Sequence, residues 1–340
     1  MLAGGRQHLD LVVYRRDGFQ GEVECTVEGL PEGIQVTSAI IPAGASTGAL
    51  LLTAPDKLPA WNGVITVLAH ATIFGKKITR QARAGCLVWP NPLEQNNNPG
   101  ISRWCRSTVL ATRSGNPALR ISLPEAPLAL PAGGASNLLV KLERLNPDAK
   151  VPVTISPVHL PPGVLFNNNQ PLVLAADKAE QEVRLQVPST VVAEKFPVIL
   201  RAVAQVPFAK DPASKQKPAV LTSETSNAMV VQVYRQVVKW KNPPATLEIT
   251  PEQESKLSID LLREQNYQGP VTVQIQGLPA GVTINSAVIP EKTDQAERSI
   301  KATKNAQTKP EGVPIMVRFT GVVNGVNLVT EQSFQLVVKK

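Results

Sequence analysis

The sequence contains few of the residues from which catalytic and metal sites are usually built. It has three histidines and three cysteines in 340 residues. None of them forms the close-spaced group of ligands that a zinc or calcium site needs. We therefore predict that His8, His70 and His159 have structural roles, and that the chain binds no metal and no cofactor.

Motifs of several enzyme classes are also missing. The chain has no H-E-x-x-H zinc motif, no P-loop and no EF-hand loop. The carboxylates of Glu22 and Glu24, and of Glu252 and Glu254, are two residues apart, the spacing of neighbours on one face of a strand. We interpret these pairs as solvated strand faces, predict no catalytic residues and expect that the chain is not an enzyme.

Aromatic residues are scarce, at 4% of the chain, although the net charge is +8. Proteins that bind single-stranded nucleic acid interleave basic residues with aromatic residues that stack on bases. Here the basic residues are scattered, so we predict no nucleic-acid binding. Adhesion to an anionic surface such as acidic polysaccharide stays open, and would use the local pairs Lys76/Lys77, Lys239/Lys241 and Lys339/Lys340.

Long apolar runs and a recognisable export signal are absent as well. No run approaches the roughly 20 apolar residues of a membrane-spanning helix, so we predict no direct membrane insertion. Residues 1–6, MLAGGR, lack the basic start and apolar core of a secretion signal. The 30 prolines and 22 glycines favour short strands joined by many turns over long helices.

What the sequence does contain is internal repetition. Residues 18–42, GFQGEVECTVEGLPEGIQVTSAIIP, return without a gap as residues 266–290, NYQGPVTVQIQGLPAGVTINSAVIP. A more diverged copy lies between them: residues 3–5, AGG, recur as 132–134, and Arg15 recurs as Arg144. Self-similarity of this kind indicates tandem copies of one domain.

The third copy has the strand pattern of an immunoglobulin-like domain. Apolar residues alternate with polar ones over residues 257–261, 271–275 and 282–284, which is the period of half-buried strands. Further strands are expected at residues 245–249, 296–303, 313–323 and 326–338, with a hairpin turn at Asn324-Gly325. About seven strands in about a hundred residues predict an all-β chain of three tandem immunoglobulin-like β-sandwich domains.

We place the three copies at residues 1–116, 117–241 and 242–340. Residues 90–106, PNPLEQNNNPGISRWCR, are expected to form a long loop of the first copy, and Asn242-Pro243-Pro244 a stiff connector before the third. The first copy lacks the opening strand that precedes the matching position in the others. We therefore expect an unpaired edge beside residues 9–14, and a natural polypeptide that extends upstream.

The motif Gly-Leu-Pro-x-Gly of the first and third copies, and Leu-Pro-Pro-Gly of the second, marks a chain reversal. Proline fixes φ for the second position of a turn, and glycine takes the positive φ that other residues resist. We predict that the glycines matter for folding and that each leucine closes the end of its sandwich. The residues are Gly29, Leu30, Pro31 and Gly33, then Leu160, Pro161 and Gly163, then Gly277, Leu278, Pro279 and Gly281.

The cysteines fall into two groups. Cys25 aligns with Ile155 and Val273 on the apolar face of a strand, so we predict a buried thiol that packs as a small hydrophobic residue. Cys86 and Cys105 bracket the long loop, and an exported protein could close that loop with a disulfide between them.

The four tryptophans do not repeat from copy to copy. Trp89 and Trp104 flank the long loop, Trp61 precedes a strand and Trp240 lies near the second boundary. We expect packing at domain joints, with Trp89 and Trp104 as the place to look for a sugar-binding platform.

Several short motifs together resemble a known class of repeat. The first copy contains R-x-x-G-F-x-G, G-L-P-x-G and I-x-P-A-G, and in the second L-P-P-G is followed by residues 167–171, NNNQP. This combination resembles the tandem Ig-like repeats of large exported proteins in planctomycete-type bacteria, which often also carry a pre-peptidase C-terminal domain. The resemblance implies an extracellular, periplasmic or cell-surface location and brings no catalytic residues.

These observations favour a non-enzymatic structural or adhesive array, a spacer or interaction scaffold within a larger exported or cell-surface protein. Its partners would be other domains of the same polypeptide, surface proteins or polysaccharide. The alternative is an accessory β-sandwich region of a secreted hydrolase, a protease, whose catalytic domain lies outside this chain. A carbohydrate-binding module is a third hypothesis.

Overall fold

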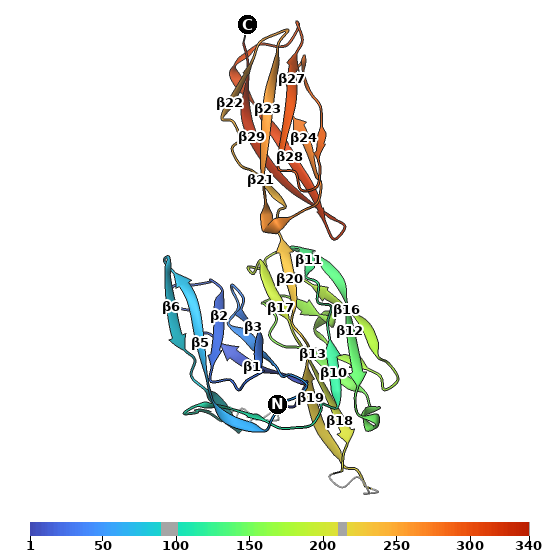
Figure 1. The fold of residues 1–340 in the computed structure, drawn as a ribbon. Coiled ribbons are helices and arrows are strands. Elements are labelled where there is room, and N and C mark those ends of the chain that lie inside the picture. Colours follow the sequence, from blue (N-terminus) through green and yellow to red (C-terminus); the bar gives the residue numbers. More distant parts are fainter. Residues whose placement is uncertain (90–100, 210–215, 340) are drawn as a thin grey trace. The chain divides into compact units, whose positions relative to one another are not determined.

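A computed structural model describes residues 1–89, 101–209 and 216–339, except for the side chains of residues 86–89, 101 and 102. Within these residues the chain is all-β, with three single-turn 3₁₀ segments and no α-helix, so the predicted fold class is confirmed. The chain divides into two compact units (Figure 1). One comprises Met1–Leu128 and Ala135–Val231, and the other comprises Ala129–Gly134 and Gln232–Lys340.

The first copy is built from two layers that β3 joins. β3 pairs with β4 along most of its length and with β2 at Ile40 and Ile41. Alternate residues of β2 and β4, such as Cys25 and Leu50, meet in one core. The strand order is β1-β4-β3-β2-β5-β6, and β9 also pairs with β5. The strands are β1 (Arg6–Val12), β2 (Val23–Glu28), β3 (Gln35–Ile41), β4 (Thr47–Thr53), β5 (Trp61–Ile73), β6 (Lys76–Gln81) and β9 (Thr108–Thr112).

The second copy has three short sheets around its own core. Their strand orders are β10-β12-β16-β14, β15-β13-β18-β19 and β11-β20-β17. The strands are β10 (Leu119–Ser122), β11 (Leu128–Pro131), β12 (Ala135–Arg144), β13 (Val153–Pro157), β14 (Leu165–Phe166), β15 (Leu172–Leu174), β16 (Glu180–Gln186), β17 (Lys195–Val198), β18 (Leu200–Pro207), β19 (Ala219–Thr225) and β20 (Met229–Tyr234). A separate hairpin, β7 (Gly85–Trp89) with β8 (Ile101–Trp104), precedes this copy in the chain.

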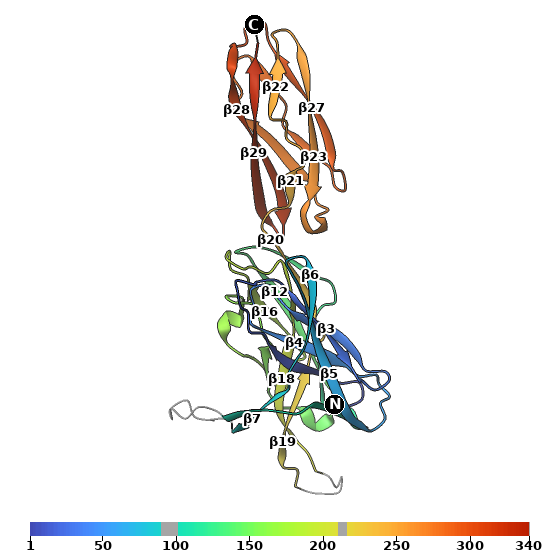
Figure 2. The ribbon, with the colours of Figure 1, turned by 90° about the vertical axis from the view of Figure 1, so that its left-hand side faces the viewer.

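The third copy is a sandwich of two sheets. One has the order β21-β23-β27-β25 and the other β22-β29-β28-β24-β26. β22 runs parallel to β29, and the two lie side by side in Figure 2. The strands are β21 (Val238–Trp240), β22 (Thr246–Ile249), β23 (Glu254–Arg263), β24 (Val271–Gln276), β25 (Val282–Ile284), β26 (Ala287–Ile289), β27 (Gln295–Ala302), β28 (Lys309–Val323) and β29 (Val326–Val338).

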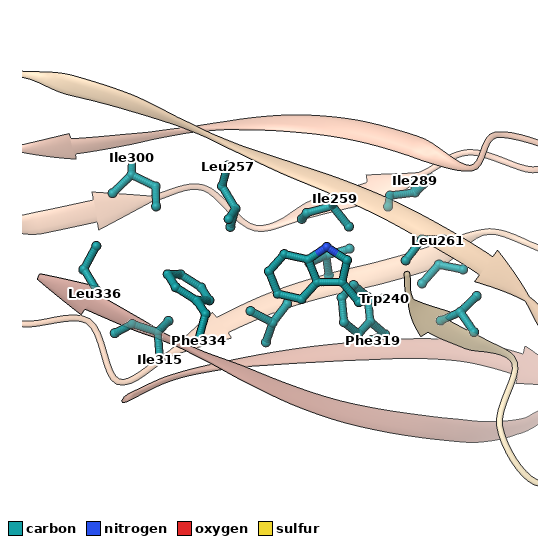
Figure 3. Packing of buried hydrophobic residues seen from close by; sticks show 14 of the residues in the cluster. Trp240, Leu257, Ile259, Leu261, Ile289, Ile300, Ile315, Phe319, Phe334 and Leu336 are labelled. Carbon is teal, nitrogen blue, oxygen red and sulfur yellow. The ribbon is translucent and has the colours of Figure 1, made fainter. Parts of the chain in front are cut away.

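Trp240 lies in the core of this third sandwich, not in a linker. Its ring centroid is 6.0 Å from those of Phe319 and Phe334, both in edge-to-face contact, and Figure 3 shows the indole between the side chains of the two sheets. β21 precedes residues 242–244 and pairs with β23. The residues expected to form a connector therefore join two strands of the same sandwich.

Candidate functional site at the joint of the first and second copies

The two faces of β4 are buried in different places. The pleat of a strand sends alternate side chains to opposite faces. Leu50 and Leu52 enter the core of the first copy. Ala49 and Leu51 instead join a separate apolar cluster with Val158 and Ile199 of the second copy. Five consecutive residues of β4, 48–52, are buried for this reason.

Polar side chains lie beside this apolar cluster, since His8 and Asp10 of β1 pair with Leu51 and Ala49 of β4. His159 Nε2 of the second copy lies 2.8 Å from Oδ1 of Asp10 in β1, and His8 Nε2 lies 3.7 Å from the same oxygen. His8 Nδ1 is 3.0 Å from Oγ1 of Thr225 at the end of β19. Two of the three histidines, far apart in the sequence, therefore meet at one carboxylate.

Glu224 is a buried carboxyl at the same joint. Its Oε1 accepts a hydrogen bond of 2.5 Å from the backbone N–H of Arg6, and only 8% of the residue is exposed. Burial raises the pKa of this carboxyl to about 7, because desolvation disfavours the charged form, while the hydrogen bonds from the backbone of Arg6 and Thr225 and the charges of Arg6 and Arg120 act in the opposite direction.

The second copy thus covers the edge of β1 that faces away from β4. In the second and third copies the strands that match β1 are β12 and β23, and each has a further strand beside it, β10 or β21. β1 has no such strand among the described residues and ends its sheet, while β9 pairs with β5. The carboxyl of Glu224 accepts the hydrogen bond from Arg6 N–H that a neighbouring strand would otherwise accept.

His159 has a backbone conformation that its sequence position explains. In the motif of the other two copies this position is Gly29 or Gly277, with φ of +79° and +87°. His159 keeps a positive φ of +49°. A residue with a Cβ is strained in this region, and such strain is typical of functional positions. The alignment of a histidine with two glycines was the signal that could have identified this residue from the sequence.

The other turn residues lie where the motif requires a reversal. Gly33, Gly163 and Gly281 have φ of +87°, +79° and +79°. The leucines of the motif are half-buried, and Leu30 and Leu278 pack against the cores of their own copies. The function of these turns in folding stays a prediction.

An arginine that the sequence analysis did not interpret holds the loops of each copy. Arg15 donates to the backbone carbonyls of Gly21, Pro42 and Ala45 at 2.6, 2.9 and 2.7 Å. The matching Arg144 and Arg263 bond carbonyls in the same way. The arginine of R-x-x-G-F-x-G therefore holds loops together through hydrogen bonds to their carbonyls, and we call it a loop clamp.

Residues 44–48, GASTG, match the G-x-S-x-G motif of hydrolases, a match that the sequence-based reasoning above missed. That motif places its serine on a sharp turn between a strand and a helix. Here the segment connects β3 to β4, two strands, and the carbonyl of Ser46 accepts from Val13 N–H at 2.8 Å. The surroundings are not those of a nucleophile elbow.

The predicted cysteine and tryptophan sites are described only in part. Cys25 is buried and unbonded as predicted, and burial raises its pKa to about 11. The side chain of Cys86 lies outside the described residues, so its disulfide with Cys105 stays a prediction. The side chain of Trp89 is likewise outside them, while 69% of Trp104 is exposed.

His70 lies apart from the joint. Its ring nitrogens are each 2.9 Å from a threonine hydroxyl, Thr26 and Thr79, on neighbouring strands. No group of three metal ligands occurs among the residues that the structure describes. None of the described helices has the length and apolar character needed to span a membrane.

No family model and no curated protein matches the chain. Among solved structures, an I-band fragment from titin is 10% identical, covers 100% of this chain and 94% of its own, and has a TM-score of 0.27. Fibronectin(III)-like modules of CbhA from Clostridium thermocellum are 12% identical over 64% of this chain and 94% of theirs, with a TM-score of 0.25. The Ig-like class of the present chain follows from its own sheets.

Proposed function

We propose that this chain is a non-enzymatic spacer or scaffold in which the first and second copies act as one rigid body. The observation that carries the proposal is the double burial of β4, whose Leu50 lies in the first core and whose Leu51 lies in the apolar cluster shared with the second copy. Domains of one chain move relative to each other unless their interface is large and hydrophobic. Here the contacts of His159 with Asp10 and of Glu224 with Arg6 extend the apolar cluster. Rigid coupling is what a spacer requires.

The wider setting is part of the same proposal. The resemblance to exported repeat proteins supports an extracellular or cell-surface location in a bacterium, where the chain would be one region of a larger polypeptide. An accessory role beside a secreted protease is the alternative, and it requires a protease domain in the same reading frame.

Adhesion is a second candidate function, favoured by the edge strand β6. Lys76, Lys77 and Arg80 are all exposed on this strand, which ends its sheet. Such a basic edge suits an acidic polysaccharide. Retention on an immobilised acidic polysaccharide that falls with salt, and that is lost in a K76E/K77E double variant, would support it. Retention that the double variant keeps would contradict it.

Electron-spin distance measurements test the spacer. Non-natural ketone residues at the exposed positions Thr72 and Gln181 allow one spin label to be placed on each copy of the full chain. We expect a single narrow distance distribution for the native sequence. L51D should broaden it by placing a charge in the apolar cluster, whereas L221D, at a leucine with 65% exposure, should not. A broad distribution without any substitution would overturn the proposal.

A further inference from the structure

Two proton-binding groups, one buried and one half-buried, lie where the second copy covers β1. They are Glu224, with 8% of the residue exposed, and His8, with 15% of its side chain exposed. Both contact the other copy directly, Glu224 through the Arg6 N–H and His8 through the hydroxyl of Thr225. A change of charge at either group therefore acts on the joint itself.

We propose that this joint is a pH-responsive latch, in which a proton on Glu224 tightens the contact between the two copies and a proton on His8 loosens it. The proposal rests on the proposed function, because only copies that form one body can be latched. It assigns a regulatory role to residues that the spacer function does not need.

The effect of Glu224 follows from its surroundings. The groups that face it are the backbone N–H and guanidinium of Arg6, the guanidinium of Arg120 and the N-terminal amine of Met1. Desolvation outweighs these groups and raises the pKa of the carboxyl from 4.5 to about 7. The carboxyl therefore keeps its proton up to a higher pH in the closed joint than in the open joint. The free energy by which Glu224 favours the closed joint is fully present below about pH 4.5, and it is lost as the pH rises to about 7.

The effect of His8 has the opposite sign. Desolvation lowers its pKa from 6.5, the charge of Asp10 raises it, and Arg201 and His159 lower it further. The closed joint therefore favours the neutral ring. The free energy by which His8 favours the closed joint is fully present above pH 6.5, and it is lost as the pH falls below that value. Between pH 6 and pH 8 most of the range lies above the pH at which His8 acts, whereas Glu224 loses its proton near pH 7, so we expect the joint to be tighter at pH 6 than at pH 8.

The strain at His159 fits the same device. This residue accepts an unfavourable φ of +49° where the other copies use glycine, and in that position it reaches Asp10 at 2.8 Å. The same Asp10 oxygen lies 3.7 Å from His8 Nε2. His159 therefore holds the Asp10 carboxylate in place beside His8, whose ring is positively charged once it is protonated.

Amide hydrogen exchange of Arg6 in the nitrogen-15-labelled full chain tests the latch, because this N–H is the donor to Glu224. Its protection factor, corrected for the intrinsic exchange rate, reports how often the joint opens. In H8N, the loss of protection between pH 5 and pH 8 beyond that of an H8N/E224Q double variant reports Glu224 against the same Met1 and His159 background, and should be on the order of 100-fold. In E224Q, an isostere that keeps the acceptor oxygen, protection should instead rise over this range.

Matched controls exist in the same unit. E125Q changes an exposed glutamate and H70N a histidine on another face of the first copy, and neither should alter the pH profile of Arg6. Carbon-13 titration of the Glu224 carboxyl in the native chain needs no substitution, and should give a midpoint near pH 7.

The outcomes separate the two proposals. A protection factor that does not depend on pH in H8N, or a Glu224 midpoint near 4.5, would overturn the latch while a narrow spin-label distribution left the spacer standing. A broad distribution at every pH would overturn both.

Discussion

Gly281 ends the turn motif of the third copy with φ of +79°, and a Cβ at this residue would lie 2.7 Å from Ala306 Cα. Strain and steric overlap therefore act together. We expect G281V to lower the free energy of unfolding of the third copy by more than about 1 kcal/mol. Urea unfolding followed by hydrogen exchange of peptides from this copy would measure the loss.

Gly325 provides the matched control for that substitution. It also has positive φ, at +76°, but nothing lies within 4 Å of a Cβ built there. G325V should therefore cost less than G281V. Equal effects would show that backbone strain alone, without the contact to Ala306, explains the result.

Cys25 supplies a second test at the residue scale. Burial raises its pKa to about 11, so its reactive thiolate is scarce at pH 8. We expect a thiol reagent to modify Cys25 only after unfolding in urea, as followed by mass spectrometry of the peptide that contains it. Modification of the folded chain within minutes would contradict the burial of this side chain.

Single residues also show how far sequence reasoning reaches. The buried thiol at Cys25 could be predicted because a strand alternates and the aligned residues are apolar. The meeting of His8 and His159 at Asp10 could not, since it depends on how two copies pack and no local pattern encodes that. The replacement of glycine by His159 was visible in the aligned motif and was overlooked.

At the scale of elements, the repeated arginine holds loops that no strand pairing fixes. Arg263 has only 7% of its side chain exposed and donates to the carbonyls of Gly269, Pro290 and Thr293 at 2.6, 3.0 and 2.7 Å. We expect R263M to lower the stability of the third copy by about 1–3 kcal/mol, because three loop carbonyls lose hydrogen bonds from a buried charged donor.

R263K should not restore the loss, since an ammonium cannot reproduce the planar fork of a guanidinium. K256M removes an exposed partner of Glu297, with 74% of the lysine side chain accessible, and should change stability by less than about 1 kcal/mol. Urea unfolding of the three variants would compare them. A full rescue by R263K would contradict the clamp.

The strands of the third copy were largely predictable because their side chains alternate. The predicted runs at residues 313–323 and 326–338 correspond to β28 and β29, and the Asn324-Gly325 turn between them has positive φ at both residues. β21 was missed because it is short and ends just before Asn242-Pro243-Pro244, which looked like a linker. Tertiary packing of Trp240 determined its place.

At the scale of the whole molecule, repetition predicted the architecture but not the joint. Each copy brings the same strands and turns, so the sequence indicates an Ig-like array. What distinguishes the first pair is a strand with two buried faces, Leu50 on one side and Leu51 on the other. In the sequence this strand is a plain apolar run, which does not reveal that its two faces have different partners.

Residual dipolar couplings of the backbone amides in the full chain test the central claim most directly. If the first and second copies form one rigid body, couplings from β1 to β6 and from β12 to β20 will fit a single alignment tensor. In L51D, the couplings of the two copies should then require two different tensors, while the couplings within each copy still fit a single one. Two tensors of different magnitude in the native chain would show that the copies move independently, and would contradict the account.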